Sequence, residues 1–159
     1  MQPHEIKPDT KLCTILGYNA QTGYMRRYFN RIMKHNGQNA TAIALNITDE
    51  HFEFTMRSVG QSKVDKMMIE REFSEQATTY CENLDSCATK EGRVDFIEVR
   101  EGKVYGFCLK DDAHALFDTP KYLDDQTVFV AKMMILASRW YGTKIDIDDI
   151  PLLIGDKDA

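Results

Sequence analysis

The stretch GRVDFIEVREGKVYGFCLKDD, residues 92–112, predicts two β-strands that meet at Glu101-Gly102. Two alternating apolar runs joined by a short loop containing Gly are typical of a β-hairpin. A second glycine, Gly106, and a pair of carboxylates, Asp111 and Asp112, follow the turn. The stretch therefore predicts a hairpin that presents a polar segment at its end.

Strands and helices alternate on the N-terminal side of this hairpin. Apolar runs bounded by Gly, Asn or Thr predict strands, and apolar residues at helical spacing predict helices between them. In order, the predicted elements are a strand at 12–18, a helix from Thr22 to 36, a strand at 40–47, a helix capped by Thr48, a strand at 64–69 and a helix at about 72–87. The pattern βαβαβαββ predicts an α/β fold with a mostly parallel sheet.

One long helix dominates the C-terminal side. Residues 111–124 contain Pro120 and no periodicity, which predicts a loop or linker, and residues 125–141 are apolar almost all round. Such a helix is mostly buried, so we expect it to pack back on the sheet. Gly142 ends it, and residues 145–154 favour a last short helix.

The bulk composition favours one folded domain. The chain has 159 residues, 43% of them hydrophobic and 28% charged, which predicts a single domain over 1–159 with its core at about 11–111. A net charge of −5 argues against nucleic-acid or anionic membrane partners and favours small molecules or proteins. No apolar run is long enough for a leader or a membrane span.

The four cysteines lie at irregular spacings, and no CxxC motif occurs among them. This pattern signals neither a zinc site nor a redox pair. We therefore expect Cys13, Cys81, Cys87 and Cys108 to be reduced core residues, no bound metal and a cytoplasmic location.

The order of these elements and short motifs resembles the substrate-binding domain of shikimate dehydrogenases, followed by the C-terminal helix of that family. The motifs that carry the resemblance are Gly17 with Asn19-Ala20-Gln21-Thr22-Gly23, Gly60 through Ile69, Gly92 through Phe96, Gly106 through Asp111, and Val130-Ala131-Lys132 with Trp140-Tyr141-Gly142. The match touches nearly the whole chain, and the order of elements carries most of it.

The resemblance implies five site residues. Thr22 stands where paired serines of the family hold a substrate carboxylate at a helix N-terminus, although Thr is also a common helix cap. Asp95 and Lys132 replace a substrate-binding Asn and Gln, while Lys66 and Asp111 are candidates for the family's Lys–Asp proton-transfer pair. Because charges replace neutral groups at two of these positions, we expect a different ligand.

The chain contains no Gly-x-Gly-x-x-Gly motif for a dinucleotide. We therefore expect no cofactor on this chain, and NADP only if a partner chain supplies a Rossmann domain. The leading interpretation is a non-catalytic or regulatory module that binds a small anionic or hydroxylated metabolite. The alternatives are a substrate-binding subunit of a shikimate/quinate-type NADP-dependent dehydrogenase, and a protein-interaction or structural homodimer.

Overall fold

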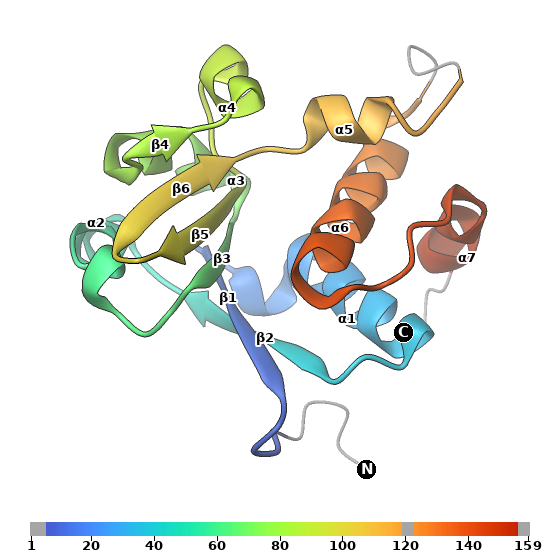
Figure 1. The fold of residues 1–159 in the computed structure, drawn as a ribbon, viewed down its shortest axis with the longest axis horizontal. Helices are drawn as coiled ribbons and strands as arrows, with labels where there is room; N and C mark the ends of the chain where they lie inside the picture. The colour runs from blue at the N-terminus through green and yellow to red at the C-terminus, as the bar shows by residue number, and fades with distance from the viewer. Residues whose placement is uncertain (1–5, 119–122, 156–159) are drawn as a thin grey trace. The chain divides into compact units, whose positions relative to one another are not determined.

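A computed structural model describes residues 6–118 and 123–155 (Figure 1). The strands are β1 (Lys11–Gly17), β2 (Ala40–Asn46), β3 (Lys66–Ile69), β4 (Asn83–Leu84), β5 (Phe96–Arg100) and β6 (Lys103–Phe107). The α-helices are α1 (Tyr24–Asn36), α2 (Asp49–Arg57), α3 (Arg71–Ser74), α4 (Ser86–Glu91), α5 (Lys110–His114), α6 (Asp125–Tyr141) and α7 (Ile150–Gly155). Short 3₁₀ turns are η1 (Ala20–Thr22), η2 (Val59–Gln61), η3 (Gln76–Tyr80) and η5 (Ile147–Asp149).

The strands form one six-stranded sheet in the order β2-β1-β3-β5-β6-β4. Strand β1 is parallel to β3, and β4 is parallel to β6, whereas β5 is antiparallel to both of its neighbours. Lys11 N donates to Asn39 O at one end of the β1–β2 pair, and Ile47 N donates to Gly17 O at the other. Strands β1 and β2 are therefore also parallel. The predicted α/β fold with a mostly parallel sheet is confirmed.

The predicted hairpin is confirmed as β5 and β6, drawn in yellow in Figure 1. Arg100 pairs with Lys103, which leaves Glu101 and Gly102 as a two-residue loop. Both have positive φ, 53° and 77°. Two consecutive positive φ angles define the turn whose twist matches that of the flanking strands, and this geometry explains the glycine.

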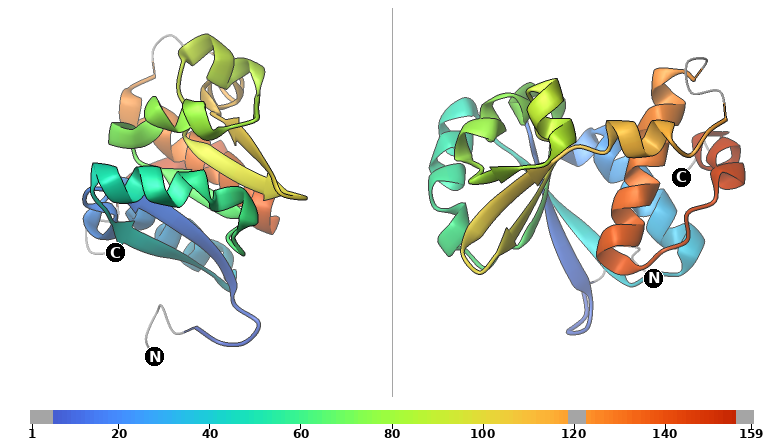
Figure 2. Two further views of the ribbon diagram at one scale, coloured as in Figure 1. Left: turned by 90° about the vertical axis from the view of Figure 1, so that its left-hand side faces the viewer. Right: turned by 45° about the horizontal axis from the view of Figure 1, so that its top comes forward.

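Apolar side chains cover one face of the sheet. Leu16, Met67, Ile69 and Ile97 on the strands pack with residues of α2, η2, α3 and η3 in one buried cluster. Figure 2 shows these segments in teal and green along one side of the strands. At the centre of the cluster the Phe52 and Phe73 rings stack with centroids 4.3 Å apart.

Contacts between residues divide the chain into two compact units. The sheet unit comprises Leu12–Arg26 and Ala42–Cys108 and holds most of the sheet. The helical unit comprises, within the described residues, 6–11, 27–41, 109–118 and 123–155. The prediction of one domain over 1–159 stays a prediction.

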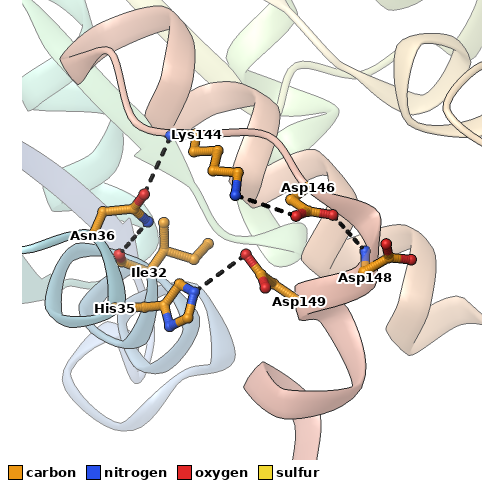
Figure 3. Close-up of polar contacts among 7 residues, drawn as sticks. All are labelled: Ile32, His35, Asn36, Lys144, Asp146, Asp148 and Asp149. Atoms are coloured by element: carbon orange, nitrogen blue, oxygen red, sulfur yellow. Dashed lines mark hydrogen bonds and ion pairs between the residues drawn. The ribbon is translucent and has the colours of Figure 1, made fainter.

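The helical unit joins the last turns of α1 to the C-terminal segment. Figure 3 shows the Asn36 side chain donating to Ile32 O at 2.8 Å and accepting from Lys144 N at 3.2 Å. His35 Nε2 lies 3.2 Å from the Asp149 carboxylate, and Lys144 Nζ lies 3.3 Å from that of Asp146 (Figure 3). These acidic side chains are therefore engaged in structural contacts.

Helix α6 spans the predicted residues 125–141. The Asp124 side chain accepts from Thr127 N at its start, and Gly142, with φ 72°, ends it. Its buried side chains include Val130, Met133 and Leu136, as expected for an apolar helix. That α6 packs back on the sheet stays a prediction. Among residues 6–118 and 123–155, no helix is long and apolar enough to cross a membrane.

Three predicted segments differ in the structure. The helix predicted at 72–87 is wrong, because α3, η3, β4 and α4 occupy this region. The β-branched pair Thr78-Thr79 disfavours a long helix, and Asp85 starts a new one by accepting from Ala88 N at 2.8 Å. The predicted linker at 111–124 begins within α5, and residues 119–122 lie outside the described residues. Helix α1 begins at Tyr24, so Thr22 does not cap it.

The expectation of four reduced cysteines is also wrong. Cys87 of α4 and Cys108 after β6 form a disulfide, whereas Cys13 and Cys81 are not disulfide-bonded. The two bonded residues are 21 positions apart, and the fold rather than a local motif brings them together. Disulfides are typical of oxidising compartments, so the cytoplasmic location stays a prediction.

Candidate functional site

The order of the strands places a candidate site at the carboxyl ends of β1 and β3. The chain leaves β1 through α1 to reach β2 on one side, and it leaves β2 through α2 to reach β3 on the other side of β1. Ligands of open α/β sheets bind where such connections diverge, outside the carboxyl ends of the strands. We call residues 17–25, 46–49 and 70–73, all in the sheet unit, the switch-point edge.

Glu70 directly follows β3 and lies at the N-terminus of α1. Its carboxyl group accepts a hydrogen bond from the Met25 N–H, and its Oε1 atom is buried without a hydrogen-bond partner among the described residues. A Cβ atom at Gly17 would lie 2.5 Å from Glu70 Cγ, and one at Gly23 would lie 2.9 Å from Oε1. The two glycines therefore make room for this side chain.

A carboxyl group is electrostatically suited to this place. The first N–H groups of a helix have no partner within the helix, and the helix dipole favours negative charge there. Glu70 thus occupies, from within the chain, a place where a bound anion would be favoured. A ligand carboxylate would have to displace it.

Burial raises the pKa of Glu70, and the negative charge of Glu72 raises it further, whereas the hydrogen bond from Met25 lowers it. The resulting pKa is about 7. Near neutral pH the group is therefore present in both forms, so it can donate a hydrogen bond to a hydroxyl group or accept one from it.

Other polar groups surround Glu70 at the same edge. Tyr18 N donates to Glu72 Oε2 at 2.8 Å, and the Tyr18 hydroxyl donates to the Asp49 carboxylate. The hydrogen bond to Asp49 raises the pKa of Tyr18. Gln21 N donates to Asn46 Oδ1 at 3.0 Å. These carboxylate, amide and hydroxyl groups match the hydrogen-bonding needs of sugar-like hydroxyls. Among the residues described, no group of three or more possible metal ligands occurs.

Thr22 belongs to this edge, and Asp95 lies beside it. Thr22 is exposed, and its hydroxyl donates to Asn19 O at 3.4 Å in the turn before α1. Asp95 is buried with 6% of its surface exposed, lies 4.0 Å from Arg93 Nε, and accepts from Ile69 N through its carbonyl oxygen. The sheet therefore holds Asp95 beside the residue that precedes Glu70.

Lys66 lies at the other end of β3. It is the first residue of the strand, it pairs with Glu98, and its Nζ atom lies 3.2 Å from the Asp65 carboxylate. Four residues of extended strand separate it from Glu70 by about 13 Å. The structure does not bring Lys66 to the switch-point edge.

Asp111 and Lys132 belong to the helical unit. Asp111 is exposed in α5, and Lys132 is half-buried in α6 with its Nζ atom 5.9 Å from the centroid of the Phe129 ring. A role for either in a site with the other three residues stays a prediction.

Sequence reasoning missed Glu70. The available signal was its place directly after a strand predicted to be parallel, because side chains at that position line the binding edge of an α/β sheet.

Replacing Glu70 with Gln is expected to change how stability depends on pH. Because the folded pKa of about 7 lies above the usual 4.5, the folded form binds more protons between these pH values, and its stability falls as pH rises through them. In Glu70→Gln the free energy of unfolding should no longer fall with rising pH through this group. The effect is on the order of 1–2 kcal/mol after allowance for partial exposure. Urea unfolding at pH 5 and pH 8 measures the difference.

The matched control is Glu75→Gln, because Glu75 is an exposed glutamate five residues further along. This control should follow the wild-type profile. Parallel wild-type and Glu70→Gln profiles across pH 5 to 8 would contradict the placement of Glu70.

Comparison with known proteins shows what fold this is. No family model matches the sequence, and no curated protein matches it. Among solved structures, a shikimate dehydrogenase from Aquifex aeolicus is 20% identical with a TM-score of 0.60, over 75% of this chain and 44% of that one. A shikimate 5-dehydrogenase from Thermus thermophilus, in complex with NADP(H) and shikimate, is 14% identical with a TM-score of 0.57, over 67% of this chain and 41% of that one.

A third match extends further along the chain. The ligand-free 5-ketofructose reductase of Gluconobacter sp. strain CHM43 is 12% identical with a TM-score of 0.59, over 95% of this chain and 60% of that one. The predicted resemblance is thus confirmed in the fold, which is that of part of a shikimate dehydrogenase. The chain spans 41–44% of the length of the two shikimate dehydrogenases described above.

Proposed function

We propose that this chain is a non-catalytic module that binds a small, uncharged, polyhydroxylated metabolite at the switch-point edge. The observation that carries this proposal is the Glu70 carboxyl group at the N-terminus of α1. A ligand carboxylate at that place would be repelled by the negative charges of Glu70 and Glu72, whereas a ligand hydroxyl group would donate hydrogen bonds to them. The expected preference for an anionic ligand is therefore replaced by one for a hydroxylated, neutral ligand.

Two further observations support this ligand class. The groups around Glu70 are amide, hydroxyl and carboxylate groups, among them Asn46 and Asp49, which suit sugar-like hydroxyls. The fold also matches a reductase named for 5-ketofructose, an uncharged polyhydroxylated sugar, over more of this chain than it matches the shikimate dehydrogenases. Thr22 and Asp95 are further candidate ligand contacts at this edge.

A matched pair of ligands tests the charge preference directly. Shikimate and its methyl ester share their hydroxyl groups and differ in the charge of the carboxyl group. We expect isothermal titration calorimetry at pH 7.5 to show that the ester binds about tenfold or more tightly than the acid, and that fructose also binds. Equal or tighter binding of shikimate would overturn the proposal.

The second candidate function is that of a substrate-binding subunit of an NADP-dependent dehydrogenase whose nucleotide domain lies on another chain. It is favoured by one observation, namely that a matched shikimate dehydrogenase was solved with NADP(H) and this chain spans only 41% of it. In that function Lys66 and Asp111 are the candidate proton-transfer pair, and Lys132 is a candidate substrate contact. Fluorescence titration of NADPH separates the two candidate functions. The non-catalytic proposal predicts no saturable binding of NADPH, either by this chain alone or by this chain mixed with a candidate partner chain. The second candidate function predicts saturable binding in the mixture.

A further inference from the structure

An apolar groove lies in the helical unit, where the end of α5, the start of α6 and the η5–α7 segment come together. Helices α5 and α7 both contact α6 (Figure 1). The groove has a volume of about 430 Å³, which is within the range of ligand pockets. Its lining includes Phe117, Thr127, Ile147, Ile150, Pro151 and Ile154. Thr127 alone among these has a polar side chain, so an occupant must supply apolar groups.

The segments that line the groove carry negative charge. The stretches within two positions of these lining residues contain five aspartates and no Lys, Arg or His. Within the described residues, these stretches are 115–118, 125–129 and 145–155. Since consecutive Cα atoms are about 3.8 Å apart, the backbone of each aspartate lies within about 8 Å of that of a lining residue.

Three of these aspartates form what we call the acidic rim of the groove. Two of the five already pair with Lys144 and His35 (Figure 3). The other three, Asp118, Asp125 and Asp148, are exposed, and each belongs to a different segment of the lining. Negative charge around an apolar surface favours a cationic partner and disfavours an acidic one.

We propose that this groove binds a basic amphipathic helix of a partner protein. The apolar face of such a helix inserts side chains at i, i+3 or i+4 spacing into a groove between helices. Its Lys or Arg side chains, which border that face, lie against the acidic rim. All of these residues belong to the helical unit, so the proposal does not depend on the ligand proposed for the switch-point edge.

Model peptides test the charge and the amphipathic character of the partner. Two peptides of about 14 residues, long enough to form a helix on binding, share leucines at helical spacing and carry either Lys or Glu at every other position. We expect fluorescence anisotropy to give a Kd of about 10 μM for the Lys peptide and no binding of the Glu peptide. A scrambled Lys peptide, whose leucines share no face, should bind at least about tenfold more weakly. Equal binding of the Lys and Glu peptides would overturn the proposal.

Charge variants of the chain locate the bound peptide. Asp125→Asn/Asp148→Asn removes two charges from the acidic rim and should weaken binding of the Lys peptide about tenfold. The matched control Glu75→Gln/Asp112→Asn removes two exposed charges outside the lining stretches and should bind the peptide as the wild type does. Equal affinity of the two double variants would mean that only the net charge attracts the peptide, and the proposal would be wrong.

Ile147→Ser tests the apolar lining. Because Ile147 is 36% exposed, we expect this variant to fold, which far-UV circular dichroism verifies, and to bind the Lys peptide about tenfold more weakly. The matched control Leu152→Ser changes a residue of α7 that is 60% exposed and does not line the groove, so it should bind as the wild type does. If a second copy of the chain occupied the groove instead, sedimentation equilibrium would show a wild-type dimer that Ile147→Ser dissociates, and this result would also overturn the proposal.

Discussion

Phe73→Ala is expected to lower the free energy of unfolding by about 3–5 kcal/mol, which is typical of a large aromatic side chain removed from a core. Phe73 is fully buried, its ring stacks on Phe52, and its centroid lies 4.9 Å from that of Tyr18. It also follows Glu70 by three positions, so it anchors the segment that presents the candidate site. Urea unfolding followed by far-UV circular dichroism measures the loss.

Phe54 supplies a matched control for this variant. It lies in α2, two residues after Phe52, but 77% of its surface is exposed. Phe54→Ala should change stability by less than about 0.5 kcal/mol. If the two alanine variants lost similar amounts of stability, the placement of Phe73 in the core would be wrong.

Reduction of the Cys87–Cys108 disulfide is expected to cost about 3 kcal/mol. The bond joins residues 21 positions apart, and a crosslink of that span restricts the unfolded chain. A thermal melt with and without dithiothreitol should differ by about 5–10 °C. The size of this difference measures how strongly the bond holds α4 to the end of β6.

Cysteine variants distinguish this disulfide from the other thiols. The double variant Cys87→Ala/Cys108→Ala should melt at the same lower temperature whether or not reductant is present. Cys81→Ala should keep the wild-type response, because Cys81 is a free thiol. Equal melting of oxidised and reduced wild type would show that the pair contributes nothing in solution.

Local sequence patterns were sufficient for the elements that are stabilised locally. The hairpin followed from Glu101-Gly102, and α6 followed from its apolar run between Asp124 and Gly142. The helix predicted at 72–87 failed because the β-branched pair Thr78-Thr79 disfavours a long helix and Asp85 starts a new one. The disulfide was not predicted, since no spacing rule pairs cysteines from separate elements.

The candidate site was only partly accessible from sequence. The resemblance identified the β1–α1 connection with Thr22 and the start of β5 with Asp95, both of which lie near the switch-point edge. It did not identify Glu70, because the family motif carries no glutamate there and the importance of this residue arises from the fold. The packing of Gly17 and Gly23 against its side chain and the hydrogen bond from the Met25 N–H show that a carboxyl group fills the N-terminus of α1.

The placement of Glu70 can be measured through its own titration. Carbon-detected NMR of the chain labelled at glutamate side-chain carboxyl groups, with Glu70→Gln to assign the resonance, reports the pKa of this single group. We predict a midpoint of about 7, because the group is buried beside Glu72. A midpoint near 4.5, the usual value for a solvated glutamate, would mean that the Glu70 side chain is not buried at the N-terminus of α1, and it would contradict the basis of the proposed ligand class.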